Sequence, residues 1–229
     1  MISQAVFLVG GLGTRLGQYT ATTPKPLLKV GGRPFLDYLL DQAAGHGFTD
    51  IRLLAGHHGE KVMDGYDGAD WRGARVQVSC EPEPLGTGGA LRFVQDQLDD
   101  IFLLANGDSY LDIDLRAFIE SGRTPGPRLA LIGNVAGDRY GRVTLDGDAV
   151  RVFSAPGVLG HGPINGGVYR MLRSDIAQLP VGFLSLESGL LPQLAAEGRL
   201  TGVVYDAYFI DIGVPEDFER ADREFPERF

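Results

Sequence analysis

The sequence predicts an α/β fold: a Rossmann-like, mostly parallel mixed sheet flanked by helices, with a small antiparallel extension. Short apolar runs alternate with amphipathic segments, and each run stops at a glycine or a polar residue, which predicts the parallel sheet. The pair Asp146-Gly147 between two apolar segments predicts a hairpin, which supplies the extension. The chain has 229 residues, 44% of them hydrophobic, and can therefore form one sizeable core.

The first half of the chain has the pattern of βα units. Residues 5–9 form an unbroken apolar run, typical of a strand buried in a parallel sheet. Further strands are expected at 51–55, 76–78 and 101–105, and helices at 34–46, 60–66 and 89–98. Because parallel strands end at one edge of the sheet, the loops that follow the first and last of these strands should both lie at that edge.

The second half has a different pattern. We expect a hairpin of 142–145 and 149–153, a strand at 167–170, and helices at 175–179, 186–196 and 215–223. No linker, repeat or low-complexity tract interrupts the sequence, so we expect a single domain over residues 1–229.

Composition excludes several classes of function. The net charge of −9 argues against nucleic-acid binding, which needs a basic face. No apolar run approaches the length of a membrane span, and the N-terminus lacks the basic region of a secretory signal. Cys80 is the single cysteine, so no intramolecular disulfide can form. We therefore expect a soluble, cytoplasmic protein without nucleic-acid or membrane partners.

Positive charge is concentrated near the N-terminus. Residues 1–36 contain no Asp or Glu, but they contain Arg15, Lys25, Lys29 and Arg33. A local positive field can attract an anion to a protein that is acidic as a whole.

A glycine-rich loop follows the first strand and carries groups suited to phosphate. Gly10, Gly11 and Gly13 allow a tight turn and a close approach of the backbone to a ligand. Consecutive N–H groups of such a loop can form an anion-binding nest. Thr14 adds a hydroxyl, and Arg15 adds a bidentate phosphate donor. The loop is therefore a candidate triphosphate site.

A lysine follows the loop in an unusual setting. Lys25 stands between Pro24 and Pro26, which hold its backbone extended. Leu16 occupies the position of the last glycine of a dinucleotide-binding fingerprint, and no Walker A tripeptide occurs. The broken fingerprint disfavours a dehydrogenase.

These residues carry a resemblance to a known family. Residues 10–16, Gly-Gly-Leu-Gly-Thr-Arg-Leu, and 24–27, Pro-Lys-Pro-Leu, resemble the signature of the sugar-phosphate nucleotidyltransferases. The resemblance implies the nucleotide-diphospho-sugar transferase type of fold. It also implies transfer of a nucleoside monophosphate from an NTP to a sugar 1-phosphate, with release of pyrophosphate. In that reading, residues up to about 125 bind the nucleotide, residues 126–229 bind the sugar, and Arg15 and Lys25 hold the phosphates.

A second glycine-rich segment resembles the base-recognition loop of the family. Residues 81–90 read Glu-Pro-Glu-Pro-Leu-Gly-Thr-Gly-Gly-Ala, and the likeness is strongest to guanylyltransferases. The resemblance assigns Gly86 and Thr87 to nucleotide binding. A carboxylate can accept both the N1–H and the exocyclic amine of guanine, which makes Glu81 the candidate for base selection. A solvated loop glutamate is the alternative.

Two aspartates are candidate ligands of a Mg²⁺ cofactor. Asn106-Gly107-Asp108 follows a predicted strand, and Asp211 follows an apolar run and precedes a glycine. Mg²⁺ needs only one or two protein carboxylates when it also binds phosphates. The resemblance assigns the metal to Asp108 and Asp211, a catalytic role to Asp108, and nucleotide binding to Asn106 and Gly107. A turn or a helix cap is the alternative for either aspartate.

The resemblance also supplies a sugar pocket. It assigns sugar binding to five residues: Tyr140, Gly141, Asn165, Gly166 and Glu187. A turn is the alternative for Tyr140 and Gly141, and a strand start is the alternative for Asn165. A helix cap is the alternative for Ser185, which opens the Ser-Leu-Glu segment of Glu187. One departure concerns the sugar phosphate, because the lysine that many members carry after the hairpin is missing here. The resemblance then leaves the phosphate to Arg142, Arg151, His161 or the metal.

Within the family, the sequence looks most like the bacterial D-glycero-D-manno-heptose 1-phosphate guanylyltransferases. That likeness implies GTP and D-glycero-α-D-manno-heptose 1-phosphate as substrates and a GDP-heptose for surface polysaccharide as product. A mannose 1-phosphate guanylyltransferase or a UDP-sugar-forming member is the alternative. The missing lysine also leaves open a non-catalytic regulator that binds nucleotide sugars. The sequence does not determine whether the chain forms a homo-oligomer.

Overall fold

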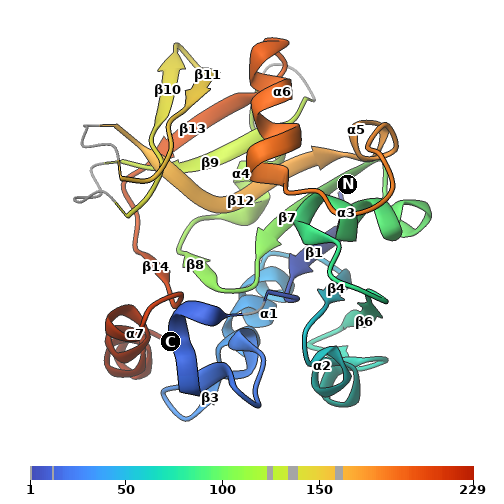
Figure 1. Cartoon of the computed structure of the whole chain (residues 1–229). Helices are drawn as coiled ribbons and strands as arrows, with labels where there is room; N and C mark the ends of the chain where they lie inside the picture. Colours follow the sequence, from blue (N-terminus) through green and yellow to red (C-terminus); the bar gives the residue numbers. More distant parts are fainter. Residues whose placement is uncertain (1, 12, 123–125, 134–138, 158–161) are drawn as a thin grey trace. The chain divides into compact units, whose positions relative to one another are not determined.

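The computed structural model describes residues 2–11, 13–122, 126–133, 139–157 and 162–229 (Figure 1). The chain divides into two units, each assembled from segments far apart in sequence. The first unit comprises Met1–Leu85, Leu104–Tyr110 and Ile210–Phe229; the second comprises Gly86–Leu103 and Leu111–Phe209. The proposed division at about residue 125 into nucleotide-binding and sugar-binding parts stays a prediction.

The first unit contains a parallel sheet. β1 (Gln4–Leu8), β4 (Asp50–Ala55) and β6 (Ala74–Cys80) are parallel neighbours in that order, and β5 (Asp70–Trp71) adds an antiparallel edge. The end of β7 (Ile101–Asn106) lies on the other side of β1. Ala5, Val6 and Phe7 of β1 are at most 2% exposed, which explains why the sequence shows an apolar run there. The expected βα pattern is confirmed.

Short elements surround this sheet. The helices are α1 (Phe35–Gly45), α2 (Gly59–Tyr66) and α7 (Pro215–Arg228), and two 3₁₀ turns, η1 (Thr14–Thr20) and η2 (Lys25–Leu27), precede them. Two small two-stranded sheets are formed by β2 (Lys29–Val30) with β3 (Arg33–Pro34), and by β8 (Ser109–Leu111) with β14 (Phe209–Asp211). The last helix is longer than the predicted 215–223, because Phe225 is fully buried against Tyr38, with ring centroids 4.7 Å apart.

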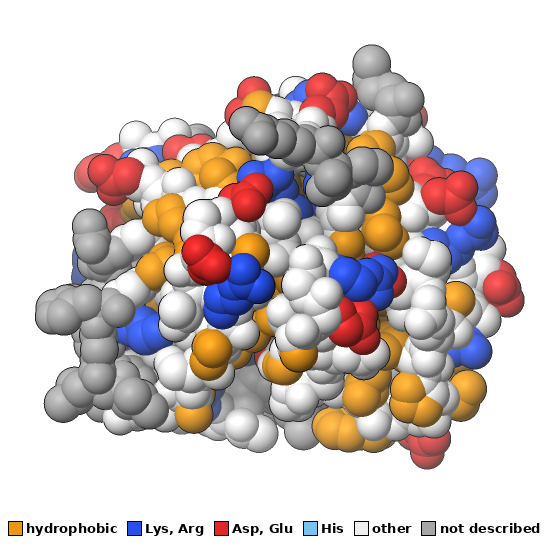
Figure 2. Space-filling model, turned by 90° about the horizontal axis from the view of Figure 1, so that it is seen from above, with side chains coloured by type: hydrophobic (Ala, Val, Ile, Leu, Met, Phe, Trp, Pro, Cys, Tyr) orange, Lys and Arg blue, Asp and Glu red, His pale blue; other side chains and the backbone are white. Residues whose placement is uncertain are grey.

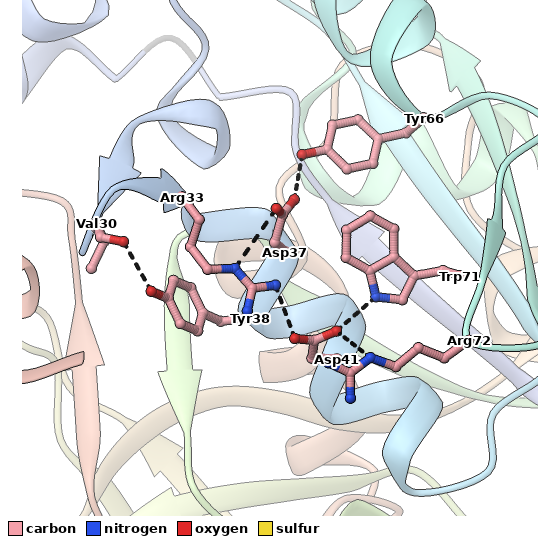
Figure 3. Close-up of polar contacts among 8 residues, drawn as sticks. All are labelled: Val30, Arg33, Asp37, Tyr38, Asp41, Tyr66, Trp71 and Arg72. Carbon is pink, nitrogen blue, oxygen red and sulfur yellow. Dashed lines mark hydrogen bonds and ion pairs between the residues drawn. The ribbon is translucent and has the colours of Figure 1, made fainter. Parts of the chain in front are cut away.

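A polar cluster connects α1 to β5 and α2. One carboxylate of α1, Asp41, accepts hydrogen bonds from the Trp71 indole and from Arg33, each at 2.9 Å, and pairs with Arg72 (Figure 3). The Tyr66 hydroxyl, in α2, donates to Asp37, one turn earlier on α1, at 2.6 Å. The strands β3 and β5 and the helix α2 are therefore joined to α1 through two of its acidic side chains.

The second unit is mostly antiparallel. Its strands are ordered β10 (Val143–Asp146), β11 (Ala149–Phe153), β13 (Thr201–Tyr205), β9 (Arg128–Ile132) and β12 (Ile164–Leu172), with only β13 and β9 parallel. Its helical segments are α3 (Gly86–Phe93), η3 (Gln95–Gln97), α4 (Leu115–Glu120), α5 (Arg173–Ile176), η4 (Leu186–Leu190) and α6 (Leu191–Ala196). The predicted hairpin and the antiparallel extension are confirmed, but the turn is Gly147-Asp148 and not Asp146-Gly147, because Asp146 ends β10 and pairs with Ala149. Gly147 supplies the positive φ, at +62°.

Several predicted boundaries were wrong. The helix expected over 89–98 begins at Gly86 and ends at Phe93, and a 3₁₀ turn follows it. The helix expected over 186–196 is divided, because its first turn is a π-helical turn. Pro34 lies in β3 immediately before α1, not in the first helical turn. The strand β9 was not predicted, although its apolar residues form an unbroken buried run like that of β1.

The described surface carries mixed charge on the face that Figure 2 shows. Acidic and basic side chains are interspersed there with apolar ones, and no contiguous basic patch forms among its described residues. No helix among the described residues is long and apolar enough to cross a membrane.

Candidate active site

The glycine-rich loop leaves β1 beside the loop that leaves β4. A β-carbon at Gly10 would stand 2.7 Å from the Gly56 amide nitrogen, so the two loops approach each other too closely for any side chain. Gly13 has φ +63°, a conformation that favours glycine. Apart from its chain neighbours, no described residue lies within 4 Å of the β-carbon position of Gly11, and Gly11 is exposed. Position 12 lies outside the described residues.

The polar residues of the loop lie on η1. Thr14 and Arg15 begin this turn, and both are exposed. Arg15 Nη2 lies 3.1 Å from the β-carbon position of Gly213, close to the segment that carries Asp211. The structure therefore places the arginine beside one of the two predicted metal ligands.

The lysine of the Pro-Lys-Pro segment contacts the other predicted ligand. Lys25 is only 8% exposed, and its Nζ donates to Asp108 Oδ2 at 2.7 Å. The expected extended backbone is found at Pro24 but not at Lys25, which begins the 3₁₀ turn η2, because the Leu28 N–H donates to the Lys25 carbonyl at 3.0 Å. Because a buried lysine needs a counter-charge, this contact explains how its ammonium group can stay inside the protein.

The two aspartates lie on adjoining backbone segments. Ile212 N–H donates to the Asp108 carbonyl at 2.9 Å, which joins the end of β14 to the start of β8. Asp211 is 9% exposed, and its Oδ1 accepts the Gly213 N–H at 2.7 Å. The structure thus brings together Arg15, Lys25, Asp108 and Asp211, all within the first unit.

The donor set fits Mg²⁺. Two carboxylates offer the hard oxygen ligands that this ion prefers, and the phosphates of a nucleotide would complete its coordination. No group of three or more His, Cys, Asp or Glu side chains suitable for a metal forms among the described residues. The magnesium site stays a prediction.

The Asn-Gly-Asp segment places Asn106 at the end of β7. Gly107 N–H donates to the Leu8 carbonyl at 2.9 Å, and a β-carbon at position 107 would stand 2.6 Å from that oxygen. Gly107 is therefore required for the close approach to β1. Asn106 is half-buried at the same edge, and its nucleotide-binding role remains a prediction.

Glu81 is held beside the glycine loop. Its N–H donates to the Ala55 carbonyl, and its Oε2 accepts the Leu85 N–H at 3.1 Å. Its Oε1 fills the space that a side chain at Gly56 would need. Burial raises the pKa of the Glu81 carboxyl above its ordinary 4.5, and the Leu85 N–H partly opposes that shift. Glu81 is thus a half-buried, oriented group and not a freely solvated one.

The sequence analysis did not identify Gly56. Its signal was its position, because it follows a buried parallel strand directly, as Gly10 follows the strand beside it.

The start of α3 is packed against a segment of the same unit. Gly86 has φ +71°, and a β-carbon there would stand 2.6 Å from the Leu184 carbonyl oxygen. Thr87 donates through Oγ1 to Glu187 Oε2 at 2.9 Å. A predicted nucleotide-binding residue and a predicted sugar-binding residue are therefore in direct contact.

The remaining predicted sugar residues lie in the second unit. Asn165 donates from Nδ2 to the Tyr169 hydroxyl at 2.8 Å and accepts the Gly167 N–H at 2.8 Å, so its amide is fixed in one orientation. Gly166 is buried, and a β-carbon there would stand 3.0 Å from the Ala130 carbonyl oxygen. The turn that precedes β10 carries the two other members of the set, Tyr140 and Gly141. Their sugar-binding roles stay predictions.

Two of the three side chains considered for the sugar phosphate, Arg142 and Arg151, can be placed in the structure. Arg151 is exposed and pairs with Asp146 at 2.7 Å across the hairpin, so its charge is already compensated. Arg142 is 8% exposed and donates from Nη1 to the Gly162 carbonyl at 3.0 Å. His161 lies outside the described residues.

Comparison with known proteins agrees with this geometry. The family model for nucleotidyl transferases matches residues 4–154. The chain is 33% identical over 226 residues to the D-glycero-alpha-D-manno-heptose 1-phosphate guanylyltransferase of Aneurinibacillus thermoaerophilus, covering 96% of this chain and 97% of the relative. It is 33% identical over 225 residues to the mannose-1-phosphate guanylyltransferase of Mycobacterium tuberculosis, covering 94% of this chain and 62% of that protein.

A solved structure is similar over almost the whole chain. HddC from Yersinia pseudotuberculosis, crystallised in complex with GMP-PN, superposes with a TM-score of 0.87 at 32% identity. The match covers 98% of this chain and all of HddC. The expected fold, a mixed, mostly parallel sheet flanked by helices, is confirmed.

Proposed function

The chain belongs to the nucleotidyl transferase family, and on that premise we propose that it transfers GMP from GTP to a sugar 1-phosphate and releases pyrophosphate. One arrangement carries the proposal. Lys25 contacts Asp108 at 2.7 Å, while Ile212 N–H joins the Asp108 backbone to the segment of Asp211 and Arg15 lies beside that segment. Two cations and two carboxylates around a glycine-rich loop suit a metal-bound triphosphate.

In the proposed reaction, an oxygen of the sugar 1-phosphate attacks the α-phosphorus of GTP. The bond from that phosphorus to the bridging oxygen of the β-phosphate breaks, and pyrophosphate leaves with the electron pair. No covalent enzyme intermediate is needed. Such a transfer depends on positioning and on stabilisation of negative charge. Arg15 and Lys25 supply two positive groups, and the loop supplies backbone N–H donors.

Mg²⁺ is the cofactor that we propose for Asp108 and Asp211. When bound, it supplies neutralisation of phosphate charge and alignment of the phosphates. Lys25 is already paired with Asp108 in this structure, so its ammonium group holds that carboxylate in one orientation.

Guanine is the base that Glu81 suits best. An ionised carboxylate can accept two donors from guanine, whereas uracil and thymine present a single N–H donor. The side chain is oriented by the Leu85 N–H and by the space at Gly56, which agrees with a fixed acceptor. The GMP-PN complex of HddC, at 32% identity, supports the same choice.

D-glycero-α-D-manno-heptose 1-phosphate is the sugar substrate that we propose, giving a GDP-heptose for surface polysaccharide. The Aneurinibacillus relative supports it, because its similarity extends over nearly the whole of both chains. Mannose 1-phosphate is the second candidate, since the mannose-1-phosphate guanylyltransferase of Mycobacterium tuberculosis is also 33% identical to this chain.

Pyrophosphate release tests the proposal. The protein would be assayed with GTP, UTP, dTTP and ATP, each combined with heptose 1-phosphate, mannose 1-phosphate and glucose 1-phosphate. We expect release with GTP and heptose 1-phosphate, abolished by EDTA and restored by Mg²⁺. Thermal stabilisation by nucleotide without pyrophosphate release in any combination would instead indicate a binding protein without catalytic activity.

A further inference from the structure

Thr87, at the start of α3, is connected to the predicted sugar-binding carboxylate by direct hydrogen bonds. Its Oγ1 donates to Glu187 Oε2 at 2.9 Å and accepts the Leu186 N–H at 2.8 Å. A threonine hydroxyl has one proton to donate. The single hydroxyl proton of Thr87 is therefore donated to Glu187.

The same carboxylate oxygen is held from a second side. Ser185 Oγ donates to Glu187 Oε2 at 2.8 Å and accepts the Ser188 N–H at 3.2 Å. No hydrogen bond to Oε1 is found among the described residues, and the Glu187 side chain is exposed. The carboxylate thus has one oxygen fixed by two hydroxyls and the other directed elsewhere.

The backbone around this contact is closely packed. Gly88 and Gly89 N–H both donate to the Leu184 carbonyl, at 2.8 and 3.2 Å. Gly86 lies against the same carbonyl, where a β-carbon would stand 2.6 Å from the oxygen. Three glycines of α3 therefore pack against the backbone just before Ser185. This packing fixes the backbone of Thr87 relative to that of Ser185, so that the Thr87 hydroxyl has a defined position beside Glu187.

We propose that Thr87 is a positioning residue for the sugar, which with Ser185 orients Glu187 so that Oε1 accepts sugar hydroxyl groups. This rests on the proposed function, in which Glu187 contacts the sugar. It changes the expected role of the Leu-Gly-Thr segment: its side-chain hydroxyl serves sugar selection and not base recognition. The nucleotide-binding role predicted for Thr87 is then confined to its backbone.

The experiment compares Michaelis constants for the two substrates. Thr87→Val keeps the shape of the side chain and removes the hydroxyl. Because hydrogen bonds to a charged group are worth more than neutral ones, we expect KM for the sugar 1-phosphate to rise about tenfold, with KM for GTP within about twofold of wild type. Thr87→Ser keeps the hydroxyl and should bring KM for the sugar back toward the wild-type value. Thr144→Val, at an exposed threonine of β10, is the matched control.

A double-mutant cycle separates positioning from a general structural effect. Glu187→Gln weakens the acceptor that Thr87 is proposed to orient. If Thr87 acts through Glu187, the double variant should raise the sugar KM little more than Glu187→Gln does alone. A merely structural role for Thr87 would add its own effect to that of Glu187→Gln.

Three results would overturn the inference. They are a rise in the GTP KM on Thr87→Val, an unchanged sugar KM for that variant, and additive effects in the double variant. In each of these cases the wild-type enzyme still turns over, so the proposed function survives. Wild-type protein that releases no pyrophosphate with any sugar 1-phosphate would overturn the proposed function and this inference together.

Discussion

Arg15 and Asp211 meet at the same glycine. Arg15 Nη2 lies 3.1 Å, and Asp211 Oδ1 lies 2.6 Å, from the point where a β-carbon on Gly213 would stand. Gly213 also donates its N–H to Asp211 Oδ1 at 2.7 Å. The predicted phosphate-binding cation and the predicted metal ligand therefore lie close together only because position 213 has no side chain.

Gly213→Ala should impair the reaction while leaving the protein folded. The added methyl group would displace the Asp211 carboxylate and the Arg15 guanidinium, and misplacement by about 1 Å can cost about 100-fold in rate. Steady-state pyrophosphate release would measure the loss. Gly65→Ala is the matched control, because its β-carbon position on α2 has no atom of the described residues within 4 Å beyond its own helix and chain neighbours. Equal activity of the two variants would contradict the arrangement proposed for Arg15 and Asp211.

Lys25→Ala should lower kcat by about 100-fold or more, because it removes a positive group that stabilises transferring phosphate. The fold should persist, since the Asp108 side chain is already 30% exposed beside Lys25 and can be solvated without it. Lys29→Ala removes an exposed lysine four residues later and should leave turnover near the wild-type level. Near-normal kcat of Lys25→Ala, measured in the same assay, would show that the lysine does not act on the phosphates.

GTP binding should weaken at acidic pH through Glu81. Burial raises the pKa of this carboxyl above 4.5, and only the ionised form can accept both guanine donors. As the pH falls through that raised pKa, the dissociation constant for GTP should increase, whereas that for UTP should change much less. Calorimetric titration of both nucleotides between about pH 5 and pH 8 would measure this. Parallel pH profiles for the two nucleotides would argue against Glu81 as the base-selecting group.

The same pKa shift has a consequence for stability with the opposite sign. A folded-state pKa above the unfolded one means that stability from this group is present at acidic pH and is lost as the pH rises through the folded pKa. Glu81→Gln, which is neutral throughout, should therefore be more stable than wild type at neutral pH. The advantage should shrink toward pH 4.5, as thermal unfolding in the absence of nucleotide would show.

Asp41→Ala should destabilise the first unit. This carboxylate accepts from Arg33 and Trp71 and pairs with Arg72, so its loss leaves the Trp71 N–H without its acceptor (Figure 3). We expect a loss of about 2 kcal/mol in the free energy of unfolding, measured by urea denaturation. Asp64→Ala, at an exposed aspartate of α2, serves as control and should change stability by less than about 0.5 kcal/mol.

Local patterns in the sequence were sufficient for much of the fold. The apolar run of β1 predicts a buried strand because both faces of a parallel sheet are covered. The pair Asp146-Gly147 predicts the hairpin because its turn needs a positive φ, which Gly147 supplies, although the turn lies one residue later than predicted. The candidate phosphate residues were found in the same way, since glycines after a strand and a lysine between prolines are features of a few adjacent residues. The strand β9 was missed, although its unbroken apolar run is of the same kind as that of β1.

The sequence by itself determined the glycine-rich loop, the prolines around Lys25, and the aspartates Asp108 and Asp211 that follow two apolar runs. It could do so because backbone preference and hydrophobic pattern are local properties. Only the tertiary structure decided that Lys25 contacts Asp108, that Gly56 makes room for Glu81, and that Thr87 contacts Glu187. The last two partners lie 100 residues apart. Contacts over such separations depend on how the strands are ordered in the sheets, which no short stretch of sequence encodes.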